Sequence, residues 1–135
     1  ITGWLTNASS ARQLGIGLTG HAARGSGGAP GVSTSNVVLA AGAVTREELI
    51  ADIAEGVLVT ELIGQGVNGV TGDYSRGASG FRIVDGEIAG PVAEFTVAGN
   101  LLDMFARMTV ASDLDTHRSV DTPTLRIDGM TVAGD

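Results

Sequence analysis

The residues best suited to chemistry lie in a glycine-rich segment, Gly64–Gly80, which carries Asp73, Ser75 and Arg76 among its glycines. Glycine costs about 0.8–1 kcal/mol in a helix interior, but it lets the backbone turn with positive φ or lie close to another chain. We expect Thr71–Gly77 to form a loop, whose backbone amides and polar side chains converge on a ligand or an extended peptide. The alternative is structural: Asp73 and Ser75 cap turns, and Arg76 pairs with a carboxylate.

A serine hydrolase would need a serine, a histidine and an orienting carboxylate. The chain offers two candidates for each role: Ser75 or Ser79, His21 or His117, and Asp73 or Asp113. The sequence around Ser79, Gly-Ala-Ser-Gly-Phe, is not the Gly-x-Ser-x-Gly turn of the α/β-hydrolases, so we expect no triad. The sequence also excludes a phosphate loop of the Gly-x4-Gly-Lys type, because the chain has no lysine.

Asp113, Asp115 and His117 alternate in the sequence. In an extended strand they would project from one face as carboxylate and imidazole ligands for a divalent cation. Such a set binds only weakly without further ligands, and the alternative is a solvated turn whose aspartates cap helices or form salt bridges. The chain has no cysteine and no His-Glu-x-x-His pattern, so we expect no metal site in it.

Composition limits the partners and the compartment. Fifteen acidic residues against eight arginines give a net charge of −7, so we expect no direct nucleic-acid partner. The lack of cysteine fits the cytoplasm, and no apolar run is long enough to predict a membrane span. The 135 residues suit a single domain, 1–135. Because no initiator methionine precedes Ile1, we expect this domain to be part of a longer chain.

Two short helices are predicted from local patterns. Thr45 and Glu48 have the spacing of a capping box, so a helix should begin there and end at a left-handed cap at Gly56. Asn100 is placed to cap a second helix over 101–108. Before both of them, Ser9–Leu14 suits one helical turn.

Strands and turns account for most of the remaining chain. Asp85-Gly86 predicts a hairpin between 81–84 and 87–92, since both turn residues tolerate positive φ. Asn68-Gly69 marks a tight turn, and residues 23–36 are expected to form a flexible loop. Further strands are predicted at 37–40, 57–63, 95–98, 109–111, 124–127 and 130–133. The expected fold class is α+β, mainly β: an antiparallel sheet or partial barrel with two short helices.

Short motifs spread over nearly the whole chain point to a family. They are Ser10-Ala-Arg-Gln-Leu-Gly15, Thr19-Gly-His-Ala22, Val59-Thr-Glu-Leu-Ile-Gly-Gln-Gly-Val67, Thr71-Gly-Asp-Tyr-Ser-Arg-Gly-Ala-Ser-Gly80, Gly86-Glu-Ile88 with Pro91-Val92, Ala98-Gly-Asn-Leu101, Asp113-Leu-Asp115 and Met130-Thr-Val-Ala-Gly134. With these motifs the chain resembles the TldD/PmbA family of bacterial peptidase-associated proteins, once called modulators of DNA gyrase. Its Tyr74–Ala78 sequence has the form found in the PmbA/TldE-type subunits, so the chain resembles the C-terminal domain of such a subunit.

The resemblance implies a heterodimeric metallopeptidase that takes unfolded peptides into a closed chamber. Zinc is then expected on the TldD-type partner, and this chain is the subunit without a cofactor, which walls the chamber and holds the peptide through its glycine-rich loop and a strand edge. One alternative is a domain that stabilises the partner or dimerises with itself without touching substrate. Another is a hydrolase that acts alone through Ser75 or Ser79. The residues expected to hold the peptide are Gly72, Asp73, Tyr74, Ser75, Arg76, Gly77 and Ser79.

Overall fold

The structure is a computed structural model that describes residues 2–134. These residues form two compact units. The first holds the described residues up to Val38 together with Thr116–Asp121, and the second holds Leu39–Asp115 together with the described residues from Thr122 onward. The helices are α1 (Ala8–Leu14), α2 (Arg46–Ala51) and α3 (Leu101–Ala106). The strands are β1 (Ala22–Ala23), β2 (Gly31–Val32), β3 (Val37–Val38), β4 (Glu55–Ile63), β5 (Asp73–Val84), β6 (Glu87–Asn100), β7 (Met108–Val110), β8 (Val120–Asp121), β9 (Leu125–Ile127) and β10 (Thr131–Ala133).

The first unit contains α1 and two small strand pairs. Asn7 caps α1 by accepting a hydrogen bond from the Ser10 amide at 2.8 Å, and Gly15 ends the helix in the left-handed conformation at φ 67°. This confirms the helical turn predicted at Ser9–Leu14. β1 pairs with β2 in antiparallel fashion, and β3 pairs with β8 in parallel. The ribbon of β1 and β2 lies at residues 22–32, and the flexibility expected for 23–36 stays a prediction.

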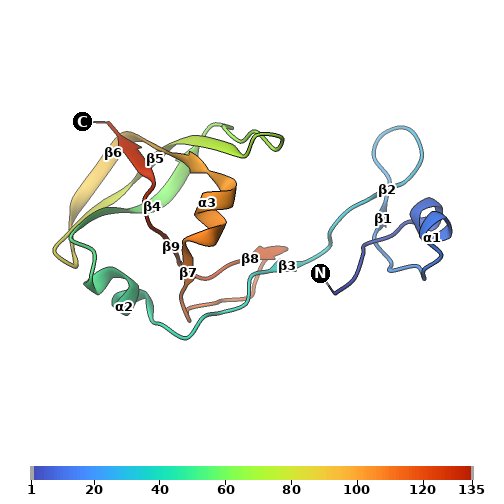
Figure 1. Cartoon of the computed structure of the whole chain (residues 1–135), viewed down its shortest axis with the longest axis horizontal. Coiled ribbons are helices and arrows are strands. Elements are labelled where there is room, and N and C mark those ends of the chain that lie inside the picture. The colour runs from blue at the N-terminus through green and yellow to red at the C-terminus, as the bar shows by residue number, and fades with distance from the viewer. Residues whose placement is uncertain (1, 135) are drawn as a thin grey trace. The chain divides into compact units, whose positions relative to one another are not determined.

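The second unit is built on a four-stranded antiparallel sheet with the strand order β10-β6-β5-β4. In Figure 1 the two longest strands, β5 and β6, run side by side with β4 next to β5. Ala78, Phe95 and Val97 form the buried cluster on one face of this sheet, and Val59 and Tyr74 are among the residues packed against it. The α+β, mainly β class is confirmed, and within residues 2–134 the sheet does not close into a barrel.

The predicted hairpin is confirmed. Asp85 and Gly86 join β5 to β6 with φ angles of 49° and 79°. The two strands expected at 87–92 and 95–98 are a single strand, β6, because a bulge and not a turn separates them. Val92 lies opposite Gly80 and Phe95 opposite Ala78, which leaves two residues of β6 facing Ser79 alone.

Helix α2 begins where the capping box predicts. The Glu48 amide donates to the Thr45 hydroxyl, and the Glu48 carboxylate accepts from the Thr45 amide at 2.7 Å. The hydrogen bond from the Thr45 amide, and after it one that the Thr45 hydroxyl donates to the same carboxylate at 2.9 Å, lower the pKa of Glu48. The predicted end at Gly56 is wrong: the helix stops at Ala51, and Gly56 lies in β4.

The early end of α2 has a tertiary cause. The carbonyl of Ile53 accepts from the Gly86 amide at 2.8 Å, and the carbonyl of Ala54 accepts from the Asp85 amide at 2.9 Å. The hairpin tip therefore occupies the acceptors next to the last turn of α2. The chain then enters β4 directly, without the left-handed glycine that the local pattern suggested.

Helix α3 follows β6 without a loop. Its cap is the predicted Asn100, which accepts from the Leu102 amide at 3.1 Å, but the helix ends at Ala106, short of the predicted 108. β7 pairs with β9, and β10 joins the main sheet beside β6. The structure thus contains the two predicted helices, both shorter than expected, in addition to α1. Among the described residues, no helix has both the length and the apolar character needed to span a membrane.

Candidate functional site

The glycine-rich segment is a loop only in its first half. A turn at Asn68-Gly69 is present as predicted, and β5 then begins at Asp73, so the loop expected to continue through Gly77 is wrong from that residue onward. The glycines do not break this strand. One of them, Gly80, lets the backbones of β4 and β5 pack closely. A Cβ atom added at Gly80 would lie 2.0 Å from the carbonyl oxygen of Leu58 on β4. Gly80 therefore serves close backbone approach within the sheet.

β5 cannot receive a peptide through its backbone. It is hydrogen-bonded to β4 on one side and to β6 on the other, whereas β4 and β10 are the edge strands of this sheet. Main-chain binding of an extended peptide requires a free edge. If this sheet holds a peptide through backbone hydrogen bonds, the edge is that of β4 or β10.

The predicted site residues divide between the two faces of β5, because alternate side chains of a strand point in opposite directions. Tyr74 lies on the face of Ala78 and packs against the buried cluster, so its role is in the core. The opposite face carries Asp73, Ser75, Gly77 and Ser79. Gly72 precedes the strand in the left-handed conformation, with φ 81°. The structure thus brings four of the seven residues together and sets Tyr74 and Arg76 apart from them.

Arg76 binds the chain's own backbone. Its Nε donates to the carbonyl of Ile63 at 3.3 Å, and its Nη2 donates to the carbonyl of Leu62 at 3.2 Å. The carboxylate partner that the structural alternative proposed is therefore replaced by two carbonyls at the end of β4. Side chains that occupy the polar groups of a strand end limit further pairing there. Arg76 thus holds the end of β4 in place.

The turn before β5 is organised by Asn68. Its side-chain oxygen accepts from the amides of Val70 and Thr71 at 2.9 and 3.2 Å, while Asp73 accepts from the Thr71 hydroxyl at 2.6 Å. The structural alternative predicted that Asp73 caps a turn, but it is Asn68 that accepts the hydrogen bonds from the backbone amides of this turn. The Asn-Gly pair gives the signal for such a turn, since asparagine side chains readily bond amides two residues on.

Helix α3 secures the other side of this turn. The Asn100 side-chain amide donates to the Thr71 carbonyl at 3.0 Å, and the Leu101 amide donates to the Gly72 carbonyl at 2.7 Å. The turn and the first residues of α3 are therefore adjacent in space. No sequence pattern joins these two segments, which lie about thirty residues apart, so this contact had no signal in the sequence.

Three of the side chains considered for a triad, Ser79, His21 and Asp113, have other partners. Ser79 Oγ lies 3.5 Å from the carboxylate of Glu61 on β4, and His21 Nδ1 lies 3.0 Å from the Thr19 hydroxyl. Asp113 accepts from both the amide and the hydroxyl of Thr124, at 2.8 and 2.7 Å. Each of these hydrogen bonds lies within one of the two units and joins residues of its own loops and strands.

The alternating carboxylates and imidazole do not form the strand on which a metal site would depend. Residues 113–117 lie outside the helices and strands of the described chain. The Asp113 carboxylate accepts from Thr124, eleven residues further along the chain, and this contact is neither the helix cap nor the salt bridge that the structural alternative proposed. Within residues 2–134, no group of three histidine, cysteine, aspartate or glutamate side chains is arranged to hold a metal ion. The described side chains therefore do not fit a zinc ion.

The hydrogen bonds from Thr124, that of its hydroxyl first, lower the pKa of Asp113 from its ordinary value of 3.8. A carboxylate with a lowered pKa stabilises the folded state above its unfolded pKa, and this stabilisation is lost as pH falls through the folded pKa. We expect the melting temperature of the native chain to fall more steeply below about pH 4 than that of Thr124→Val, which lacks the hydroxyl donor. Thermal melts between pH 7 and pH 2.5 test this, and parallel curves would contradict it.

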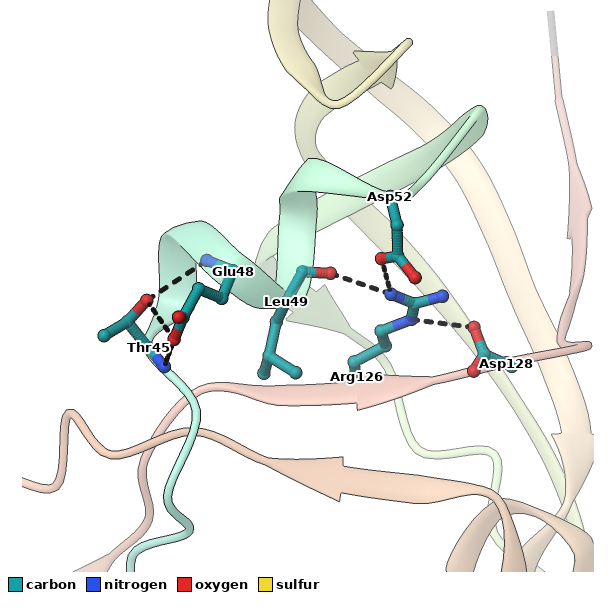
Figure 2. A network of polar contacts seen from close by, with 6 residues as sticks. All are labelled: Thr45, Glu48, Leu49, Asp52, Arg126 and Asp128. Carbon is teal, nitrogen blue, oxygen red and sulfur yellow. Dashed lines mark hydrogen bonds and ion pairs between the residues drawn. The ribbon is translucent and has the colours of Figure 1, made fainter.

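One structural arginine, Arg126, was missed by sequence reasoning altogether. Arg126 on β9 donates from Nη1 to the Leu49 carbonyl at 3.0 Å and also to the Asp52 carboxylate, and from Nε to Asp128 at 2.9 Å. Figure 2 shows its guanidinium between these three groups at the end of α2 opposite the Thr45–Glu48 box. Hydrogen bonds to Asp128 and then Asp52 raise the pKa of Arg126. Arg126 thus fixes α2, which in turn contacts the hairpin of the sheet.

Comparison with known proteins gives the family. The family of PmbA/TldA metallopeptidase C-terminal domains matches residues 1–134, and the chain belongs to it. The chain is 42% identical over 135 residues to the metalloprotease PmbA of Escherichia coli O157:H7, which covers 99% of this chain and 28% of that protein. It is also 42% identical over 133 residues to the PmbA homologue of Haemophilus influenzae, covering 97% and 28%. The chain thus spans 28% of the length of these relatives.

Solved structures share the fold. TldE from Thermococcus kodakarensis matches with a TM-score of 0.81 at 26% identity, over 98% of this chain and 31% of that one. A proposed modulator of a DNA gyrase from Thermotoga maritima matches with a TM-score of 0.77 at 31% identity, over 96% of this chain and 30% of that one. The resemblance stated from the sequence motifs is confirmed at the level of the family.

Proposed function

We propose that this chain is the non-metal subunit of a TldD/TldE-type heterodimeric metallopeptidase of the cytoplasm, and that it helps to enclose and hold unfolded peptides. The observation that carries the proposal is the close match to PmbA and TldE proteins over nearly the whole chain. Zinc on the TldD-type partner supplies the activated water for hydrolysis of the peptide bond in this scheme. The role of the present chain is to bind and orient the substrate.

The face of β5 that carries Asp73, Ser75 and Ser79 suits this task. Asp73 and Ser75 are exposed, and Glu61 on the neighbouring strand adds a further carboxylate next to Ser79. Hydroxyl and carboxylate oxygens accept hydrogen bonds from backbone amides of any peptide, so they bind main chain without selecting side chains. Gly77 in the same row leaves room beside them. Binding that is independent of side chains is what an unfolded substrate of mixed sequence requires.

The β4 edge offers the complementary backbone groups. β4 is nine residues long, from Glu55 to Ile63, and only its β5 side is paired within the described sheet. A peptide that adds to this edge gains main-chain hydrogen bonds of regular geometry. Arg76 occupies carbonyls at the far end of β4, so the available edge lies toward Glu55. Of the predicted residues, Arg76 therefore acts by limiting the binding edge, and Tyr74 acts by supporting the sheet.

Photo-crosslinking tests substrate contact directly. A benzoylphenylalanine placed at Ser75 of the full-length protein is expected to label a fluorescein-tagged unfolded peptide in the chelator-treated complex with the TldD-type subunit. The same group at Glu87, on the hairpin at the other end of β5, is the matched control and should label at least fivefold less. If the group at Ser75 crosslinks to the partner subunit and not to the peptide, the result favours the structural alternative, in which this domain stabilises the complex without touching substrate.

A further inference from the structure

Asn68 is followed by a glycine, and the pair lies exposed in the turn before β5. The backbone amide of the following residue is the nucleophile that attacks an asparagine side chain in deamidation, and glycine has no Cβ atom to crowd its approach. The chain has four asparagines, and the residues that follow the other three are Ala8, Val37 and Leu101. Asn68 is therefore the one asparagine in the chain whose neighbour leaves this attack unhindered.

The turn polarises the carbonyl group of the Asn68 side chain. Its Oδ1 accepts from the Val70 amide at 2.9 Å and from the Thr71 amide at 3.2 Å. When a nucleophile adds to the side-chain carbon, negative charge develops on this oxygen. Backbone amides that already point at such an oxygen stabilise the charge, as they do in an oxyanion hole. The fold of the turn thus favours nucleophilic attack on Asn68 Cγ.

The attacking and the leaving nitrogen are both available at Asn68. Within residues 2–134, neither the Gly69 amide nor the side-chain amide of Asn68 donates a hydrogen bond. Apart from its chain neighbours, no atom lies within 4 Å of the position where a Cβ atom of Gly69 would be. No hydrogen bond has to break, and no neighbouring group has to move, before the Gly69 nitrogen approaches Cγ.

Asn100 provides a comparison within the same chain. Its Oδ1 also accepts from the amide two residues further on, that of Leu102, at 3.1 Å. Its side-chain amide, however, donates to the Thr71 carbonyl at 3.0 Å, and the Leu101 amide donates to the Gly72 carbonyl at 2.7 Å. Both the leaving group and the nucleophile are therefore held in hydrogen bonds at Asn100, and leucine crowds the attacking nitrogen.

We propose that Asn68 is a site of spontaneous deamidation in the folded protein. The Gly69 nitrogen forms a bond to Asn68 Cγ, the bond between Cγ and the side-chain nitrogen breaks, and ammonia leaves with the proton of the Gly69 amide. Water then opens the cyclic succinimide, at Cγ to give aspartate or at the main-chain carbonyl to give isoaspartate. One water is consumed and one ammonia released, without oxidation or reduction. This inference is independent of the proposed function.

The reaction changes the turn from which the polar face of β5 begins. It adds a carboxylate to the turn that already holds Asp73, whose own carboxylate accepts from the Thr71 hydroxyl. Isoaspartate also adds a methylene to the main chain between two hydrogen bonds of Asn68. Its amide donates to the Asp73 carbonyl and its carbonyl accepts from the Gly72 amide, each at 2.8 Å. The longer main chain does not keep both hydrogen bonds in this geometry, so the start of β5 loosens.

The test follows the full-length protein during incubation at mildly alkaline pH, by tryptic digestion and mass spectrometry. Trypsin cleaves after arginine, so Asn68 and Asn100 fall in separate peptides, 47–76 and 83–107. The peptide with Asn68 is expected to gain one dalton at least tenfold faster than the peptide with Asn100, and fragment ions should place the change at position 68. Equal rates in the two peptides, or no change at position 68, would overturn the proposal.

Two further comparisons test the role of the turn. Gly69→Ala should slow the reaction at Asn68 at least fivefold at an unchanged melting temperature, because the methyl group crowds the attacking nitrogen and contacts nothing else. The native protein should react at least as fast as the same protein unfolded in urea, since unfolding removes the two amide donors. A slower reaction in the native protein, or an unchanged rate in the alanine variant, would contradict the proposal.

Discussion

Gly80→Ala is expected to lower the free energy of unfolding by about 3 kcal/mol, the upper range for overpacking a well-packed site. The added Cβ would lie 2.0 Å from the Leu58 carbonyl oxygen and 3.1 Å from the Thr60 amide nitrogen. Both atoms belong to the backbone of β4, so the strand itself has to move. For a chain of this size the loss corresponds to a fall in melting temperature of roughly 10 °C, measured by circular dichroism.

Gly77→Ala is the matched control for this prediction. It lies on the same strand, and a Cβ atom there would meet only Ile63, at ordinary contact distances of 3.6 and 3.7 Å. We expect a change within about 0.5 kcal/mol, the usual range for substitutions away from special features. Equal stabilities of the two variants would show that close approach of β4 is not the reason for glycine at position 80. Since Gly80→Ala displaces β4, it should also weaken peptide labelling from Ser75 in the complex.

The features that the sequence predicted correctly depend on neighbouring residues. The capping box of Thr45 and Glu48 involves residues three positions apart, and the Asp85-Gly86 hairpin turn involves two adjacent residues with positive φ. The cap at Asn100 is equally local. In each case the side chain and the backbone group that it serves lie within one turn, so the pattern alone contains the interaction.

The features that the sequence could not predict depend on distant residues. The end of α2 is set by amides of the hairpin tip, about thirty residues later in the chain, which bond the Ile53 and Ala54 carbonyls. The glycine-rich segment looks like a loop until β4 is placed beside it, because only then does Gly80 become a point of close contact. Burial of an edge or a face is a tertiary property, and local propensity cannot reveal it.

The sequence did not predict that the candidate site is divided between the two faces of β5, because this division also depends on the segment being a strand. The seven residues were predicted as one set, because the prediction of a loop gave no reason to separate Asp73, Ser75 and Ser79 from Tyr74 and Arg76. Once the segment is a strand, alternation puts Tyr74 into the core and turns Arg76 toward the end of β4. Whether the polar face binds peptide stays a prediction, which the labelling from Ser75 addresses.

Arg126→Met is expected to lower the free energy of unfolding by about 2 to 3 kcal/mol, since hydrogen bonds to charged groups are each worth about 1.5–3 kcal/mol and the partly buried Leu49 carbonyl loses its donor. The arginine side chain is only 22% exposed and contacts Asp52 and Asp128 together with the Leu49 carbonyl. Methionine retains most of the apolar stem, so the loss reflects the guanidinium contacts. Denaturant unfolding followed by circular dichroism measures the change.

Arg82→Met provides the comparison that isolates burial. Arg82 also pairs with a carboxylate, that of Glu55 at 2.7 Å, but the two side chains are 59% and 75% exposed. Solvent screening makes such a pair worth at most about 1 kcal/mol, so this variant should be nearly as stable as the native chain. If both variants lowered the free energy of unfolding by the same amount, the contacts of Arg126 with the end of α2 and with Asp128 would stabilise the unit no more than the exposed Arg82–Glu55 pair does. A larger loss for Arg126→Met alone would establish it as the residue that ties α2 to β9, and so supports the hairpin that α2 contacts.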